Sequence, residues 1–183
     1  MESITKLGGR PIRSDFLETD ALSALLWSLT PDNKVVCEVA LATGWRIDDV
    51  LELKYEQVQR ARQMKRHGIT ITERKTGKKS TRYFSKQMLA KMEIVHGRYW
   101  VFEGARDWRK HRTRQAVFLD LKRAAKRFNV RLNLSPHSLR KNYAVYLRRQ
   151  GKSLPEIQKQ LNHDSLTTTL LYALADELTE KNA

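Results

Sequence analysis

Four side chains in one C-terminal stretch of the sequence have the chemistry to act on a phosphodiester. His137, Arg140, His163 and Tyr172 lie between Ser135 and Tyr172. Arginine forks bind phosphate oxygens, histidine carries protons near neutral pH, and a tyrosine hydroxyl can form a covalent intermediate. The surrounding sequence predicts three successive helices with these side chains at helix ends, where they can converge on one ligand. We therefore expect an active site for a phosphodiester here.

The first of these helices is predicted to begin at Pro136. The Ser135 side chain can accept a hydrogen bond from the free N–H groups of the first turn, and Pro136 suits a position that needs no N–H. Gly151 supplies the left-handed residue that commonly follows a last turn. His137 and Arg140 are three residues apart, so they share one face of this helix.

Two shorter helices are predicted to follow. Residues 153–156, Ser-Leu-Pro-Glu, form a capping box that opens the first of them. Asn162 tolerates a left-handed backbone and is expected to end it, which turns His163 toward the same pocket. Ser165 can cap the last helix, which carries Tyr172 nine residues after His163.

An arginine near the start of the chain is a further candidate. Gly44 is expected to end a helix, and Arg46 follows in a loop before a short helix that Asp48 can cap. An arginine at such a junction can reach an anion, although an isolated one is more often a surface ion-pair partner. The assignment of Arg46 to an anion site therefore depends on the other candidate residues in the chain.

Three short runs of β-branched and aromatic residues predict strands at residues 55–58, 69–72 and 81–84. The last two are separated by the turn sequence Lys75-Thr76-Gly77-Lys78. We therefore expect a small three-stranded antiparallel sheet with Lys75 at or near a hairpin tip. Lys75 is there either a solvated turn residue or a mobile proton donor that reaches into the site.

The remaining elements are predicted to be helical. Capping and periodicity predict further helices starting near Thr19, Pro31, Ser85 and Thr113. The expected fold class is α+β, mainly α-helical, with the small sheet on one edge. The expected organisation is a flexible arm over residues 1–13, a single domain over residues 14–172 and a C-terminal tail over residues 173–183.

The charge of the chain points to nucleic acid. Its 35 Lys and Arg residues against 20 Asp and Glu residues give a net charge of +15, as expected of a nucleic-acid binder, although a merely basic soluble protein is the alternative. The excess gathers on the helix expected after Thr113, opposite its apolar side. The residues predicted to follow a DNA backbone are Arg114, Lys122, Arg123, Lys126 and Arg127.

Several function classes are excluded by what the sequence lacks. Cys37 is the only cysteine, so no disulfide is expected, and no Cys/His cluster has metal-ligand spacing. No glycine-rich phosphate loop is present, so neither a metal, a cofactor nor ATP is expected. The apolar stretch at residues 21–29 is far shorter than the roughly 20 residues of a membrane span. We expect a cytoplasmic protein.

Together these residues resemble the catalytic domain of the tyrosine recombinases, the phage integrase family, from about Thr19 to Tyr172. Residues 43–49, Thr-Gly-Trp-Arg-Ile-Asp-Asp, look like the family's first-arginine box, with Arg46 as that arginine. The remaining anchors are the hairpin lysine Lys75, the His-x-x-Arg box of His137 and Arg140, the second histidine His163, and the nucleophile Tyr172. Each motif alone is weak, but five in the right order and spacing are specific.

The resemblance implies a mechanism. Tyr172 attacks and forms a 3′-phosphotyrosyl enzyme, His137 helps to take its proton, and Lys75 protonates the 5′-hydroxyl leaving group. His163 donates to a phosphate oxygen. Arg46 and Arg140 bind the phosphate oxygens through planar forks.

The sequence departs from the family pattern at Asn162, Trp45 and Lys141, of which Trp45 and Lys141 are not catalytic positions, and also in its architecture. Asn162 stands where the second-histidine box usually carries Gly, and both residues accept a left-handed backbone. There is also no room for the separate helical domain that usually precedes the catalytic domain and clamps the other face of the DNA. The chain therefore looks like a compact member such as the fimbrial-switch invertases, or like an excised catalytic domain.

The resemblance implies a site-specific recombinase or integrase of double-stranded DNA, encoded by a bacterium, phage or mobile element. It is expected to be nucleoid-associated, a monomer when free, and a homo-oligomer on DNA through its C-terminal tail. Two alternatives remain open: a recombinase-like DNA-binding or regulatory module without strand exchange, and a relaxing topoisomerase of type IB. Trapping a covalent protein–DNA adduct separates the enzymes from the binding module.

Overall fold

The computed structural model describes residues 19–130 and 134–174. The expected arm over residues 1–13 and the part of the expected tail beyond Leu174 lie outside these residues. The helices and strands, in chain order, are α1 (Thr19–Trp27), α2 (Pro31–Thr43), α3 (Ile47–Leu51), α4 (Tyr55–Gln63), β1 (Gly68–Thr72), β2 (Lys79–Tyr83), α5 (Lys86–Val95), α6 (Arg114–Arg127), α7 (Pro136–Arg149), α8 (Leu154–Leu161) and α9 (Leu166–Ala173).

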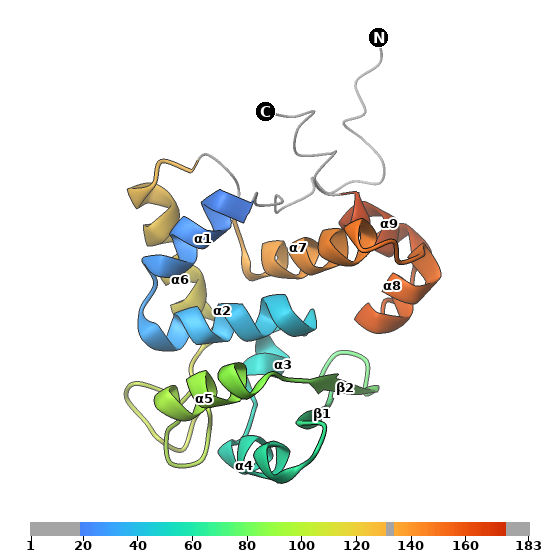
Figure 1. The fold of residues 1–183 in the computed structure, drawn as a ribbon. Coiled ribbons are helices and arrows are strands. Elements are labelled where there is room, and N and C mark those ends of the chain that lie inside the picture. Colours follow the sequence, from blue (N-terminus) through green and yellow to red (C-terminus); the bar gives the residue numbers. More distant parts are fainter. Residues whose placement is uncertain (1–18, 131–133, 175–183) are drawn as a thin grey trace.

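Two buried apolar clusters hold the described residues together. The larger cluster takes side chains from α1 to α6, the β-hairpin and the start of α7, and includes Leu25, Val36, Leu51 and Phe102. The smaller one joins α7, α8 and α9 through residues such as Ile157. Figure 1 shows α7 alongside α2, with α8 and the hairpin on the same side of the molecule. The predicted site residues lie where these elements meet.

Gly44 allows the two clusters to approach each other at the end of α2. Its φ of 69° is left-handed, which glycine adopts without steric cost. A Cβ added at Gly44 would lie 2.2 Å from Cδ1 of Tyr143 on α7, so a side chain here would displace the tyrosine ring. The predicted helix stop therefore also serves as a close contact between two parts of the fold.

The helix-capping predictions are confirmed for α5, α6 and α7. The side chains of Ser85, Thr113 and Ser135 accept hydrogen bonds from the first turns of α5, α6 and α7. Asn162 follows α8 with a left-handed φ of 49°. The prediction for α9 is wrong, because the Ser165 side chain makes no capping hydrogen bond. The prediction for Asp48 is wrong, because Asp48 lies inside the first turn of α3 and the extended residue before that helix is Arg46.

The mainly helical fold class with a small antiparallel sheet is confirmed, but the number of strands is wrong. Within the described residues the sheet has two strands, with Gly68 opposite Tyr83 and Thr72 opposite Lys79. The run predicted as a first strand at residues 55–58 is instead the start of α4. Val58 and Ala61 are its buried residues, and a spacing of three places them on one helical face.

Candidate active site

Arg140 is buried at the junction of α2, α7 and α8. Only 3% of this residue is exposed. Its Nη1 donates to the carbonyl of Gly44 and its Nη2 to the carbonyl of Leu161, so the guanidinium joins the ends of α2 and α8. Burial, followed by the nearby charge of Arg46, lowers the pKa of Arg140 to about 10, and the side chain remains cationic at neutral pH. It therefore holds a positive charge in a largely water-free position.

His163 lies directly against Arg140. Nε of Arg140 donates to Nε2 of His163 at 3.4 Å, so the proton of the neutral ring lies on Nδ1, which is 3.0 Å from Oγ1 of Thr169. Burial and the charges of Arg140 and Arg46 lower the pKa of His163 to about 3. In the free protein the ring is neutral, and its Nε2 is an acceptor.

Tyr172 faces the same histidine from α9. The rings of His163 and Tyr172 meet edge to face with centroids 5.0 Å apart. Burial raises the pKa of Tyr172, and the charges of Arg140 and Arg46 oppose this shift without cancelling it. The hydroxyl therefore remains protonated at neutral pH and needs a base before it can attack.

Arg46 lies at the mouth of the site, held by Glu73. Its Nη1 donates to Oε2 of Glu73, while the other N–H groups of Arg46 have no protein partner within the described residues. Arg46 lines a small cleft of about 30 Å³ together with Asp48, Arg114, His137 and Arg140. Three guanidinium groups around one cleft form an anion-binding surface.

His137 lines the cleft from the first turn of α7. Desolvation, followed by the charges of Arg114, Arg140 and Arg46, lowers its pKa. Because a neutral imidazole has a free lone pair at neutral pH, it can accept a proton. The residue is in part accessible to solvent and lines the cleft, so a ligand there can reach its ring.

Lys75 stands apart from the other five candidates. It lies in the exposed turn of the hairpin between β1 and β2, and no hydrogen bond joins it to them in the described residues. Its charge nevertheless acts on His163, whose pKa it helps to lower. The fold therefore brings together Arg46, His137, Arg140, His163 and Tyr172 and leaves Lys75 on a turn at their edge.

The five cations predicted for DNA binding fall into two groups. Lys122, Arg123, Lys126 and Arg127 are exposed on the outer side of α6. Arg114 differs, because at 3.6 residues per turn it shares the stripe of the buried Val117. It lines the cleft and pairs with Asp48 at 3.6 Å. Arg114 therefore borders the candidate cleft instead of lying with the other four cations, and its role in DNA binding stays a prediction.

Two residues that organise the site escaped the sequence analysis. Glu73 accepts hydrogen bonds from Arg46, Thr76 and Asn162, and Arg82 on β2 joins the ends of α2 and α8. A signal for Glu73 was present, because it continues the buried alternation of Ile69 and Ile71 along the strand. A carboxylate at a buried position of a strand requires hydrogen-bond or ion-pair partners.

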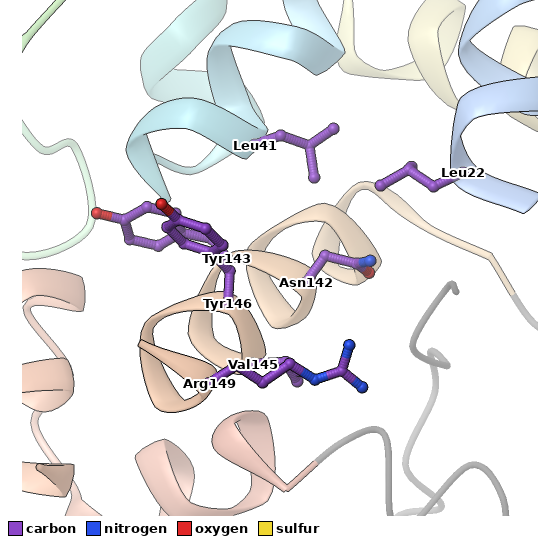
Figure 2. A pocket seen from close by; sticks show the side chains of 7 residues that line it. All are labelled: Leu22, Leu41, Asn142, Tyr143, Val145, Tyr146 and Arg149. Atoms are coloured by element: carbon purple, nitrogen blue, oxygen red, sulfur yellow. The ribbon is translucent and has the colours of Figure 1, made fainter. Parts of the chain in front are cut away.

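A second, larger cleft lies between α1, α2 and α7. It has a volume of about 250 Å³ and contains no candidate catalytic residue (Figure 2). Its lining residues are Leu22, Leu41, Asn142, Tyr143, Val145, Tyr146 and Arg149. Three candidate catalytic residues, Arg46, His137 and Arg140, line the smaller cleft instead.

The described part of the chain offers no other kind of centre. Within residues 19–130 and 134–174 no three His, Cys, Asp or Glu side chains are grouped to hold a metal ion. Within the same residues no helix has the length and apolar character needed to cross a bilayer.

Comparison with solved structures identifies the fold as that of tyrosine recombinase catalytic domains. A lambda integrase dimer bound to a COC′ core site superposes with a TM-score of 0.74 at 21% identity, over 92% of this chain and 62% of that chain. The catalytic domain of bacteriophage HP1 integrase superposes with a TM-score of 0.64 at 22% identity, over 88% of each chain.

The sequence matches the phage integrase family over residues 15–178, and the chain belongs to that family. A tyrosine recombinase XerC of Herpetosiphon aurantiacus is 33% identical over 146 residues, which are 76% of this chain and 47% of the relative. The integrase of Escherichia phage P2 is 28% identical over 158 residues, which are 86% of this chain and 42% of the relative. The chain thus spans about half the length of the curated relatives that it matches.

Proposed function

We propose that this chain is the catalytic part of a site-specific DNA recombinase or integrase, which cleaves and rejoins DNA strands through a covalent 3′-phosphotyrosyl intermediate. The observation that carries the proposal is the contact of Tyr172 with His163, which Arg140 in turn contacts. A nucleophile, a proton-carrying group and a buried cation thus adjoin one another. Family membership supports the same reaction class.

The cleavage step needs three things: a neutralised phosphate, an in-line nucleophile and a protonated leaving group. The scissile phosphate is bound in the cleft by the free N–H groups of Arg46 and by Arg140, with Arg114 as a further cation at the rim. The oxygen of Tyr172 attacks phosphorus, and His137 accepts the phenolic proton. Lys75 donates its proton to the departing 5′ oxygen.

His163 changes its role when the phosphate arrives. In the free protein its Nε2 accepts from Arg140, whereas donation to a phosphate oxygen requires a proton on Nε2. A bound diester brings a negative charge beside the ring, and a nearby negative charge raises a histidine pKa. Phosphate binding and protonation of His163 are therefore coupled.

The partner is double-stranded DNA. The exposed cations of α6 and the net charge of +15 favour it. The structurally similar lambda integrase, which was solved bound to a COC′ core site, supports the same partner. We further propose that copies assemble on DNA through the C-terminal tail at residues 173–183 and are monomers when free.

The test is capture of the covalent intermediate on a nicked suicide duplex, read on a denaturing gel. The parent should form an adduct, and Tyr172→Phe should bind the duplex but form none, because only the hydroxyl is lost. Tyr146→Phe on α7 is the matched control and should form the adduct normally. Absence of any adduct in the parent would instead favour a DNA-binding or regulatory module, and an adduct in Tyr172→Phe would remove the assignment of the nucleophile.

A further inference from the structure

Glu73 is a buried carboxylate that joins three segments of the site. It follows β1 directly, and 1% of its side chain is exposed. Its Oε2 accepts from Nη1 of Arg46 and from Oγ1 of Thr76, the latter at 3.0 Å. Its Oε1 accepts from Nδ2 of Asn162 at 2.7 Å. These donors come from the loop before α3, the hairpin turn, and the turn between α8 and α9.

Glu73 and Asn162 each lie within two residues of a candidate catalytic residue along the chain. Lys75 comes two residues after Glu73, and His163 directly follows Asn162. The hydrogen bond between Glu73 and Asn162 therefore joins the turn that carries Lys75 to the turn that carries His163. Asn162 keeps a left-handed φ of 49°, so its side chain supplies this bond from the residue that also ends α8.

A second contact joins the same two turns, but it is at the surface. Nζ of Lys78 lies 3.1 Å from Oδ1 of Asp164, and more than half of each side chain is exposed, 53% and 76%. Water and salt weaken such exposed pairs. The bond from Asn162 to the buried carboxylate of Glu73 is therefore the better shielded of the two contacts between the hairpin turn and the α8–α9 turn.

The three donors around the Glu73 carboxyl group support a role beyond packing. An ionised carboxylate is unfavourable in a buried position unless it is paired and hydrogen-bonded. The donors from Arg46, Thr76 and Asn162 meet that requirement for Glu73. An amide at this position would present an N–H₂ group to at least one of these donors, so the carboxylate alone can accept from all three.

We propose, on the basis of the strand-cleavage function proposed above, that Glu73 is a positioning residue for the leaving-group step. Through Asn162 it holds the hairpin turn so that the ammonium of Lys75 reaches the 5′ oxygen, and through its own pair it holds Arg46 at the cleft.

A modified substrate can separate protonation of the leaving group, the step that the bond between Glu73 and Asn162 is proposed to support, from the rest of the cleavage reaction. When the bond from the Tyr172 oxygen to phosphorus forms and the bond from phosphorus to the 5′ oxygen breaks, the alkoxide needs the proton of Lys75. In a 5′-bridging phosphorothiolate the leaving atom is sulfur, and a thiol is acidic enough to leave as the thiolate. A misplaced Lys75 therefore slows cleavage of the normal duplex and has little effect on the thiolate duplex.

The variant Asn162→Gly removes the amide and keeps the left-handed backbone. Asn129 offers a matched control, because it has a φ of 51° just after α6 and does not contact Glu73. Asn129→Gly changes the same residue type in the same backbone conformation. Glu73→Gln is the second variant, and thermal unfolding of all three identifies any that fails to fold.

With the normal nicked duplex, adduct formation by Asn162→Gly and Glu73→Gln should be slower on the order of 10²-fold, as for a small misplacement of a catalytic group. With the phosphorothiolate duplex Asn162→Gly should come within a few-fold of the parent, whereas Glu73→Gln should keep part of its deficit because it also releases Arg46. Asn129→Gly should match the parent on either duplex. The inference is overturned if folded Asn162→Gly cleaves the normal duplex like Asn129→Gly, or if its deficit is equally large on the thiolate duplex. A parent without any adduct overturns the proposed function itself, and this inference with it.

Discussion

Arg82 and Arg140 join the same two helix ends at neighbouring carbonyls. Each guanidinium donates once to the C-terminal end of α2 and once to the C-terminal end of α8. The four accepting carbonyls are those of Thr43, Gly44, Gln160 and Leu161. Positive charge is favourable at a helix C-terminus, where the last carbonyls have no partner in the helix. Arg140 is therefore a structural residue as well as a candidate phosphate ligand.

This relationship allows the two roles of Arg140 to be separated. Hydrogen bonds to charged groups are worth roughly 1.5–3 kcal/mol, so Arg82→Ala and Arg140→Ala should each lower the free energy of unfolding by about 2–3 kcal/mol in urea titrations. Only Arg140→Ala should also lose about 10²–10³ in the rate of adduct formation by folded protein, because only Arg140 faces the phosphate. Arg140→Lys should recover little of that rate, since an ammonium cannot bond the carbonyls of Gly44 and Leu161 as the planar guanidinium does and still present a donor to the phosphate.

Arg60→Ala on α4 is the control for this comparison, because its pair with Glu56 is exposed and contributes little. Its stability and adduct rate should stay near those of the parent. If folded Arg82→Ala loses as much rate as Arg140→Ala, the effect at Arg140 is structural and its assignment to the phosphate is wrong.

The contact between Gly44 and Tyr143 predicts a second difference in stability. Gly44→Ala combines a left-handed backbone with a Cβ only 2.2 Å from the tyrosine ring. Gly151→Ala has a similar positive φ of 78° but no atom within 4 Å of the new Cβ. The left-handed conformation alone costs about 1–2 kcal/mol, so Gly151→Ala should lose about that much and Gly44→Ala clearly more. Equal losses in urea unfolding would mean that Tyr143 moves away without cost.

Local signals in the sequence were sufficient to predict most of the helices. Caps at Ser85, Thr113 and Ser135 act between residues two or three apart, so the chemistry that starts a helix is visible along the chain. The false strand at residues 55–58 shows the limit of this approach. A four-residue apolar and polar run fits either period, and it was the continuation to Ala61 that favoured a helix.

The contacts that organise the site were not visible in the same way. Glu73 accepts hydrogen bonds from Arg46, which is 27 residues away in the sequence, and from Asn162, which is 89 residues away. The residues around Glu73 in the sequence do not indicate partners so far away. Arg114 illustrates the same limit, since its place in the cleft depends on how α6 packs against α3. The types and order of the candidate catalytic residues were predictable from motifs, whereas the residues that hold them in place became evident only in three dimensions.

His163 predicts a pH dependence of stability. Its pKa in the folded protein is about 3, below the ordinary value of 6.5, so the unfolded chain takes up this proton first as the pH falls. The contribution of His163 is therefore fully present above pH 6.5 and is lost as the pH falls from 6.5 toward 3. His163→Gln removes it, so the stability of the parent relative to the variant should decrease on acidification.

The measurement is the difference in free energy of unfolding between parent and His163→Gln, at about pH 7 and about pH 4. Groups such as Asp120 and His137 titrate in both proteins, so the subtraction removes them to first approximation. A difference that stays constant over this range would show that the ring titrates alike in the folded and unfolded chains.

The outer side of α6 predicts a salt dependence of DNA binding. Each phosphate that a protein cation neutralises contributes a slope of about −0.9 to log K against log salt. Arg123→Glu with Lys126→Glu should therefore make the slope shallower by roughly 2 and weaken binding uniformly across DNA sequences. The control reverses two exposed cations on and just after α4, Arg60→Glu with Lys65→Glu. Figure 1 shows α4 away from α6. This control changes the net charge equally but should leave the slope near that of the parent. If both double variants flatten the slope alike, DNA responds to net charge alone and α6 is not the face that follows the backbone.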